Sequence, residues 1–323
     1  MISIPSCANS FMQKCLSNKK LLDVYISIGR PKPFDVTLRD GLQTLNKDEQ
    51  QLFTTDKKIQ IYNDLIIQHS PKNIEIGSCV NEKIFPIFKD TEKLLEYANK
   101  IKCYEIINNY VLVPNLNYLQ NALKIGVKNF SLITSVSNEF QIKNTRMTIS
   151  QNEENIANML AYLDEYSNYK LDVYDDVVID YKPYNVKLYV SCINECPVVD
   201  KKLDNTDIVN TLERLSKFNI NKICLSDTCG TLIPEDLINI LRNCKTRGVD
   251  ISKFSLHLHV KPEREYIVEE LVFIALDNGI NEFDVSNLST GGCSVTMDAS
   301  KIAPNMNYEQ YYRFLTNYLE TRS

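Results

Sequence analysis

The sequence predicts a (β/α)8 barrel, the TIM-barrel fold, and three observations favour that fold. Eight short apolar segments rich in β-branched residues recur along the chain, and stretches of helical periodicity separate them. No Gly-x-Gly-x-x-Gly turn follows the first segment, whereas open doubly wound sheets often carry one there and typically have fewer strands. The length of 323 residues, 44% of them hydrophobic, suits one large core. We therefore expect an N-terminal extension over residues 1–32 and one barrel domain over residues 33–323.

The predicted strands are apolar runs of the kind that parallel sheets bury on both faces. They span residues 34–39, 73–78, 108–113, 129–136, 186–193, 222–228, 254–259 and 282–287. The predicted helices have apolar residues at three- and four-residue spacing and span residues 56–69, 91–101, 116–125, 153–166, 206–218, 234–247 and 264–278. Strands and helices that alternate in this order indicate a parallel sheet.

Charge and hydropathy argue against two kinds of partner. A formal net charge of -5 and a pI near 5.4 do not provide the basic surface that nucleic-acid binding needs. No run approaches the roughly 20 apolar residues that cross a bilayer, so we expect no membrane partner. A small acidic substrate is compatible with the composition if the positive charge is local.

The N-terminal segment and the cysteines bear on the compartment. The first 22 residues lack Asp and Glu and carry Lys14, Lys19 and Lys20, which is partly typical of a transit peptide. They also lack arginine and a clear amphipathic helix, so we expect a cytoplasmic protein, with a mitochondrial location as the alternative. The ten cysteines show no small-scaffold disulfide pattern. Cys192 and Cys224 fall in predicted strands, where buried reduced thiols are ordinary, so we expect a reducing compartment.

Polar residues gather where the predicted strands end, and the carboxyl ends of the strands carry the chemistry in such barrels. They are Arg39 and Asp40 after the first strand, Glu75 on the second, Ser191 on the fifth, Asp227 on the sixth, His257 and His259 on the seventh, and Cys293 after the eighth. These residues are far apart in the sequence, so they would meet only if the barrel forms.

His257 and His259 are the sharpest signal for a metal site. Residues two apart on a strand point to the same face, so both imidazoles would face the barrel axis. Together with the carboxylate of Asp40 they would form a facial set for a divalent metal, Mg2+, Mn2+ or Zn2+, with positions left free for substrate oxygen. An isolated His-x-His motif also occurs as ordinary strand packing, and Asp40 at the same rim favours the metal site.

The remaining rim residues have both a chemical and a structural interpretation. Arg39 would be a permanent cation suited to a substrate carbonyl or a developing oxyanion, or else a member of a surface ion pair. Glu75 and Asp227 would orient ligands, transfer a proton, or form structural salt bridges. Cys293 follows two glycines, whose backbone can come close to a ligand, and its thiol is either a proton shuttle or simply exposed.

The assembled segments are similar to those of the 3-hydroxy-3-methylglutaryl-CoA lyase family, within a wider group of metal-dependent barrels that includes isopropylmalate and homocitrate synthases. The likeness runs from about Phe34 to Leu315 and comprises "RDGLQ" (39–43), "IEIGSCV" (74–80), "VPNLNYLQNALKIGVKNFSL" (113–132), "SNEFQIKN" (137–144), "YVSCINECP" (189–197), "SDTCG" (226–230), "HLH" (257–259) and "GGC" (291–293). The "PNL", "SNEFQIKN" and "GGC" parts resemble the lyase more than the synthases.

The resemblance implies a role for each matching residue. Asp40, His257 and His259 would be metal ligands for Mg2+ or Mn2+, and Arg39 would be the catalytic cation. Glu75 and Asp227 would be polar partners in the active site, and Cys293 the cysteine of a catalytic loop. The family also has an asparagine ligand after that cysteine. Strict register would put Ile302 there, whereas a three-residue insertion places Asn305 there, and we expect Asn305.

The function that the resemblance implies is metal-assisted retro-Claisen cleavage of a 3-hydroxy-acyl-CoA to acetyl-CoA and acetoacetate, in a protein that forms a homodimer. One alternative is a Claisen-type synthase that condenses an acyl-CoA with a 2-oxo acid. Another is a barrel that binds metal or CoA without turnover. The segment Val260-Lys261-Pro262 supports that last alternative, because the family usually has an acidic or amide residue and a glycine after the second histidine.

Overall fold

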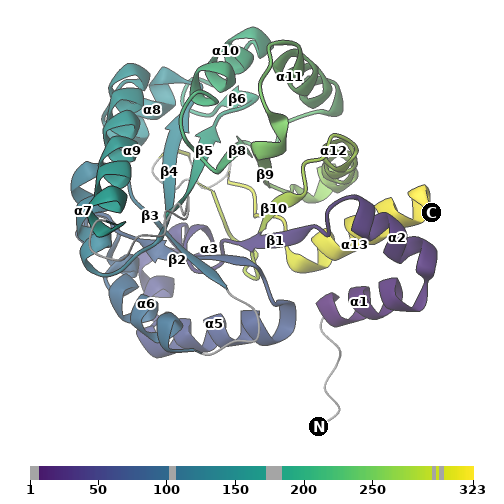
Figure 1. Cartoon of the computed structure of the whole chain (residues 1–323), viewed down its shortest axis with the longest axis horizontal. Helices are drawn as coiled ribbons and strands as arrows, with labels where there is room; N and C mark the ends of the chain where they lie inside the picture. The colour runs from purple at the N-terminus through teal and green to yellow at the C-terminus, as the bar shows by residue number, and fades with distance from the viewer. Residues whose placement is uncertain (1–6, 102–106, 172–183, 293–295, 298–301) are drawn as a thin grey trace.

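The described residues form a closed barrel of eight parallel strands ringed by helices, which confirms the predicted fold (Figure 1). The computed structural model describes residues 7–101, 107–171, 184–292, 296–297 and 302–323. The barrel strands are β1 (Lys32–Asp35), β2 (Asn73–Ser78), β3 (Asn108–Leu112), β4 (Asn129–Ser135), β5 (Asn185–Ser191), β8 (Lys222–Asp227), β9 (Phe254–Leu258) and β10 (Glu282–Val285). Their order around the ring is β1-β10-β9-β8-β5-β4-β3-β2, and β1 closes it by pairing with both β10 and β2.

Helices cover the outside of the ring, and seven of them match the predicted periodic stretches. Those seven are α5 (Thr55–His69), α6 (Thr91–Lys100), α7 (Leu116–Lys124), α9 (Ile149–Leu171), α10 (Asn205–Leu215), α11 (Pro234–Thr246) and α12 (Glu265–Asp277), and α13 (Tyr308–Arg322) follows the barrel. Shorter elements lie in the connections: α3 (Asp40–Gln43), α4 (Lys47–Gln51), η1 (Pro86–Phe88), α8 (Asn138–Thr145), the hairpin of β6 (Glu195–Cys196) and β7 (Lys201–Lys202), η2 (Ile251–Lys253) and η3 (Pro262–Arg264). Polar caps begin several helices; Thr54 and Asn115 accept hydrogen bonds from backbone N–H groups of α5 and α7.

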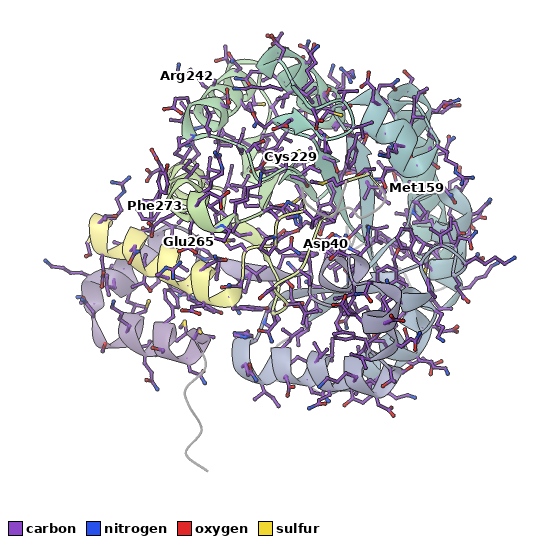
Figure 2. All side chains as sticks on the ribbon, turned by 180° about the vertical axis from the view of Figure 1, so that it is seen from behind. Asp40, Met159, Cys229, Arg242, Glu265 and Phe273 are labelled. Carbon is purple, nitrogen blue, oxygen red and sulfur yellow. The ribbon has the colours of Figure 1, made fainter. Side chains whose placement is uncertain are left out.

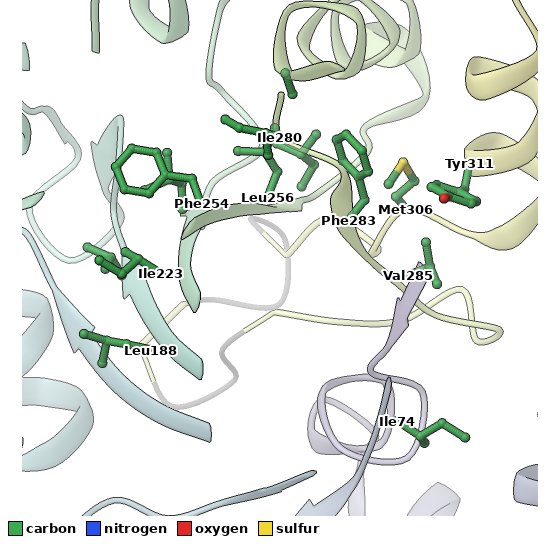
Figure 3. Packing of buried hydrophobic residues seen from close by; sticks show 14 of the residues in the cluster. Ile74, Leu188, Ile223, Phe254, Leu256, Ile280, Phe283, Val285, Met306 and Tyr311 are labelled. Carbon is green, nitrogen blue, oxygen red and sulfur yellow. The ribbon is translucent and has the colours of Figure 1, made fainter. Parts of the chain in front are cut away.

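Strand residues alternate between an apolar and a polar environment. Side chains such as Leu188, Ile223 and Phe283 join the apolar layer between the strands and the helices (Figure 3). The inside of the ring carries charged side chains beside aromatic ones such as Phe34. Lys187 on β5 bonds Asp284 on β10 although these strands are not neighbours, so the pair crosses the barrel interior. Barrel interiors are usually filled by branched apolar residues, so the buried charges in this barrel indicate a role other than packing.

The first barrel strand is shorter than the predicted run over residues 34–39 and ends at Asp35. The carboxylate of Asp35 accepts hydrogen bonds of 2.9 Å from both the N–H and the hydroxyl of Thr37, which turns the chain out of the ladder. Asp40 begins α3, and Arg39 immediately precedes it. Both residues therefore lie on the turn beyond the strand, still at its carboxyl end.

Two helices precede the barrel, α1 (Cys7–Ser17) and α2 (Lys19–Ser27). The expectation that this segment lacks an amphipathic helix is therefore wrong. Both helices lie beside α13 in Figure 1, and the ring of Phe11 stands 5.4 Å from those of both Tyr25 and Tyr312. The boundary after residue 32 stays a proposal. No helix in the described part of the chain is long and apolar enough to span a bilayer.

Candidate active site

Asp40, His257 and His259 converge at the carboxyl end of the barrel. Among the described residues they form a group whose possible metal-ligand atoms all lie within 4.8 Å of one another. All three side chains are buried, and Figure 2 shows Asp40 near the centre of the molecule rather than on the outer helices. His257 lies on β9 and His259 one residue past its end, so strand alternation turns both rings to the same side.

Hydrogen bonds fix the orientation of both imidazoles. His257 Nδ1 lies 3.0 Å from a carboxylate oxygen of Asp284, and His259 Nδ1 lies 2.9 Å from the backbone carbonyl of Asp227. Both partners are acceptors, so each Nδ1 carries the proton and each Nε2 keeps a lone pair. His257 Nε2 is 4.0 Å from Asp40 Oδ2. Burial lowers the pKa of His259 to about 4, which leaves its imidazole neutral.

Asn305 lies beside this group, as the expected insertion requires. Its side-chain amide donates to Asp40 Oδ2 over 2.9 Å, and its backbone forms an antiparallel bridge with His259. Gly291 makes room for it, because a Cβ at that position would lie 2.5 Å from Cγ of Asn305. Ile302 places a methyl group near Gly292 and has no atom that binds a metal. The positions of these two side chains therefore favour Asn305 over Ile302 as the residue that would supply the amide ligand.

Two buried polar atoms beside Asp40 show whether these side chains suit a metal ion. Nε2 of His259 and Oδ1 of Asn305 have no hydrogen-bond partner among the described residues. Buried polar atoms without a partner are rare in folded proteins. Two imidazole lone pairs, a carboxylate and an amide oxygen make a donor set that divalent cations accept. The residues present therefore fit a divalent cation.

Arg39 links two carboxylates at the rim. Its Nε donates to Glu75 over 2.5 Å, and its Nη1 donates to Asp40 over 2.6 Å. Burial acts to raise the pKa of Asp40, but the positive charge of Arg39 and the hydrogen bond from the Gly292 N–H oppose it, and that pKa lies below its ordinary value. For Arg39, the two carboxylates likewise outweigh the effect of burial and raise the pKa. Asp40 is thus ionised and Arg39 charged across the physiological range.

The side chains of Glu75 and Asp227 do not line the site, and each residue acts on it through a neighbour: Glu75 bonds Arg39, and the backbone carbonyl of Asp227 faces His259. Neither side chain lines the cavity over the metal-ligand group. Glu75 is fully buried and holds Arg39. Strand register pairs Asp227 with Leu258, whereas Ser226 pairs with His257, so the side chain of Asp227 points away from the histidines. Its carboxylate accepts the backbone N–H groups of Thr231 and Leu232 instead, and burial raises its pKa to about 6.

Cys293 lies outside the described residues, but the glycines before it are placed. The backbone N–H of Gly292 donates to Asp40 Oδ2 over 3.0 Å. Thr290 donates its hydroxyl to the carbonyl of Gly41 over 2.5 Å, which ties the same loop to α3. The loop that leads to Cys293 is therefore anchored beside Asp40.

Sequence reasoning missed Lys187 and Asp284, which lie directly behind His257. Nζ of Lys187 donates to Asp284 Oδ1 over 2.5 Å, while Oδ2 of Asp284 faces His257. The available signal was a charged residue at an alternate position within each of two apolar strands, in "VKLYVS" and "EFDVS". The predicted burial of two reduced thiols is confirmed, because Cys192 and Cys224 are both buried and neither forms a disulfide.

A cavity of about 420 Å³ opens over the metal-ligand group. Its walls include the apolar side chains of Phe88, Leu112 and Ile133 together with the polar Ser191. Among the described residues that line it, the only permanent cations are Arg39 and Arg146. Arg146 follows α8, and sequence reasoning did not single it out. The cavity thus offers two guanidinium groups to an acidic ligand, and that of Arg39 is already paired with Asp40 and Glu75.

Fold and site together define a (β/α)8 barrel with a candidate divalent-metal centre at its carboxyl rim. The family model described as HMGL-like matches residues 30–306. The chain therefore belongs to the HMGL-like family.

Curated relatives and solved structures resemble the chain over most of its length. It is 26% identical to mitochondrial hydroxymethylglutaryl-CoA lyase of Mus musculus, over 83% of this chain and 74% of the relative. It is 28% identical to a hydroxymethylglutaryl-CoA lyase of Bacillus subtilis, over 81% of this chain and 80% of the relative. An HMG-CoA lyase from Acinetobacter baumannii, solved with coenzyme A and 3-methylmalate, is 23% identical, has a TM-score of 0.69, and is matched over 90% of this chain and 83% of its own. That structural likeness supports the fold.

Proposed function

We propose that the chain is a carbon-carbon lyase of the hydroxymethylglutaryl-CoA lyase type, which cleaves a 3-hydroxy-acyl-CoA to acetyl-CoA and a 3-oxo acid, acetoacetate for the hydroxymethylglutaryl group. The observation that carries the proposal is the convergence of Asp40, His257 and His259 within 4.8 Å, directly beside the buried Arg39. Two curated relatives bear that lyase name, and the cavity presents cations to an acidic ligand.

The reaction has two costly charges. A base takes up the proton of the substrate hydroxyl group, the bond between C2 and C3 breaks, and C3 becomes the carbonyl carbon of the product ketone. The electron pair of that bond passes to the thioester as an enolate, whose carbon then takes up a proton. A site that favours cleavage must therefore stabilise negative charge first on the hydroxyl oxygen and then on the thioester oxygen.

Asp40, His257, His259 and Asn305 would hold the divalent cation, for which Mg2+ and Mn2+ are the candidates. When bound, such a cation supplies Lewis-acid charge that lowers the energy of developing alkoxide and enolate oxygens. The buried hydrogen bonds to His257 and His259 keep their Nε2 atoms directed to that place.

Arg39 would be the second source of positive charge. Its guanidinium lines the cavity and is held by Glu75 and Asp40 before any substrate arrives. A donor that is already oriented costs no reorganisation during the reaction, and one such donor contributes about a hundredfold to a thousandfold in rate. Glu75 serves in this proposal as a positioning residue for Arg39, and Asp227 as one for His259 through its carbonyl.

Cys293 would return a proton to the enolate carbon. The support is its place in the sequence directly after Gly292, whose N–H donates to Asp40. The remaining parts of the proposal are an acyl-CoA as the substrate, a homodimer and a cytoplasmic location, with a mitochondrial location as the alternative. Curated relatives carry both compartment names, since the mouse lyase is named mitochondrial and a Danio rerio lyase cytoplasmic.

Product analysis tests the proposal directly. Purified protein is incubated with 3-hydroxy-3-methylglutaryl-CoA and either Mg2+ or Mn2+, and acetoacetate is measured. We expect acetoacetate that depends on the cation and is lost in Asp40→Asn. Its absence from the wild type under all conditions, at the level of the Asp40→Asn protein, would refute the lyase. Release of free thiol from acetyl-CoA on adding 2-oxo acids would indicate a synthase instead.

A further inference from the structure

The interior of the barrel carries an ion pair that the cleavage chemistry does not use. Lys187 is 0% exposed and Asp284 is 1% exposed, and the two lie on strands that are not neighbours in the ring. Replacing a buried ion pair by apolar residues of similar volume is often neutral or stabilising for a protein. Stability alone is therefore a weak reason for a lysine and a carboxylate to occupy this interior.

Asp284 divides its two oxygens between different partners. Oδ1 accepts from Lys187 over 2.5 Å, and Oδ2 faces Nδ1 of His257 over 3.0 Å. A carboxylate held on one side by an ammonium group presents a fixed acceptor on the other side. The proton of His257 is thereby kept on Nδ1, and its Nε2 lone pair is kept on the side of Asp40.

Lys187 itself is held in place from several directions. Its Nζ lies 3.3 Å from the centre of the Phe34 ring and 3.5 Å from Glu282, in addition to Asp284. The Tyr189 ring is 5.1 Å away. An ammonium group with an aromatic face and two carboxylates around it cannot leave Asp284 without losing all of these contacts. The geometry is that of a rigid support reaching from the middle of the barrel to the rim.

We propose that Lys187 and Asp284 are positioning residues for His257, and that they fix the imidazole tautomer in which Nε2 is free to bind a cation. This inference rests on the metal site of the proposed function. It goes further because it makes Lys187 a determinant of the affinity of that site for a cation. Lys187 lies on another strand and is linked to His257 only through Asp284.

Lys187→Met and a matched control test the inference. Methionine keeps much of the volume and removes the charge. The control is Lys58→Met, because Lys58 forms the same kind of pair with Asp90 over 2.5 Å, buried like the first and linking α5 to the start of α6. Mn2+ affinity is measured by calorimetry, and the histidine tautomers of the metal-free proteins by long-range 1H–15N NMR. The chain has 3 histidines, so the spectrum is simple and a His69→Gln variant assigns the third.

We expect Lys187→Met to weaken Mn2+ binding by about 10-fold to 100-fold, the usual effect of losing support behind a ligand. In the metal-free protein, His257 should lose its pure Nδ1-H tautomer. Lys58→Met should stay within about threefold of the wild type, and Lys187→Arg should recover most of the affinity. Wild-type affinity together with an unchanged His257 tautomer in Lys187→Met would overturn the inference.

A second variant covers the case in which Lys187→Met does not fold. Asp284→Asn is nearly isosteric, keeps an oxygen near His257 and loses the charge that Lys187 holds. This variant should also weaken Mn2+ binding and give a mixture of the Nδ1-H and Nε2-H tautomers of His257. Wild-type Mn2+ affinity together with an unchanged His257 tautomer would contradict the inference. If the wild type binds no Mn2+, the metal site of the proposed function fails, whereas the tautomers of the metal-free protein still decide this inference.

Discussion

Asn305 donates its side-chain amide hydrogen to the carboxylate of Asp40 over 2.9 Å, although the two residues are 265 positions apart. The contact joins the turn after the first barrel strand to the segment that follows the last one. It brings an amide oxygen without a partner, among the described residues, to a place where two imidazole lone pairs are also buried.

Asn305→Ala should weaken divalent-cation binding. The substitution removes the amide oxygen and leaves the backbone bridge to His259 intact. We expect the Kd for Mn2+, measured by calorimetry, to rise at least about tenfold. Ile302→Ala is the control and should bind Mn2+ like the wild type. Wild-type Mn2+ binding in Asn305→Ala would show that the amide oxygen of Asn305 does not hold the cation.

Arg39→Met should impair turnover far more than metal binding. Its guanidinium would no longer stabilise oxyanion charge, so kcat/KM should fall about a hundredfold to a thousandfold while Mn2+ still binds. Arg39→Lys should remain impaired, because a single ammonium group cannot bridge Glu75 and Asp40 as the guanidinium does. Arg247→Met removes an exposed pair with Glu213 and serves as the surface control. Near-normal kcat/KM in Arg39→Met would exclude Arg39 from the chemistry.

Gly291→Ala should displace Asn305. Gly291 has φ of 145°, and an added Cβ would collide with the Asn305 side chain. Gly248 also has a positive φ, 76°, but a Cβ there would meet nothing within 4 Å. Gly248→Ala is therefore a control for backbone strain without a clash. We expect acetoacetate formation to fall sharply only in Gly291→Ala, and equal activities in the two variants would argue against a role for the Asn305 position.

Stability should depend on pH through Asp35. Burial raises the pKa of Asp35 to about 7, against the hydrogen bonds from Tyr308 and Thr37 that lower it. A carboxyl whose pKa is raised on folding binds a proton more readily in the native state. Its contribution to stability is therefore fully present below the unfolded pKa of 3.8 and is lost as pH rises through about 7. Between pH 4 and pH 8 the free energy of unfolding should fall less in Asp35→Asn than in the wild type, as measured by urea denaturation. Parallel pH profiles for the two proteins would contradict this prediction.

The strands and the metal-ligand group could be predicted from the sequence because both depend on local pattern. Apolar β-branched runs locate strands, and parallel strands end at one rim, so Asp40, His257 and His259 could be grouped without knowing the packing. The side on which Asp227 lies could not be predicted in this way. That depends on register, since its pairing with Leu258 turns it away from the histidines.

The ion pair behind His257 was also beyond sequence reasoning. Lys187 is the one charged residue of β5, and Asp284 lies in a short strand that also carries Glu282. Their contact depends on which positions face each other across a closed ring. The helices α1 and α2 were missed because they are short and their apolar residues become buried only against α13 and their neighbours, as with Phe11. Tertiary packing, rather than local periodicity, determines these features.

Anomalous diffraction from crystals grown with Mn2+ tests the central claim most directly. The account predicts one strong peak at the rim, about 2.0–2.3 Å from Nε2 of His257, Nε2 of His259, a carboxylate oxygen of Asp40 and Oδ1 of Asn305. A peak at another place, or none at these four atoms when Mn2+ is saturating, would contradict it.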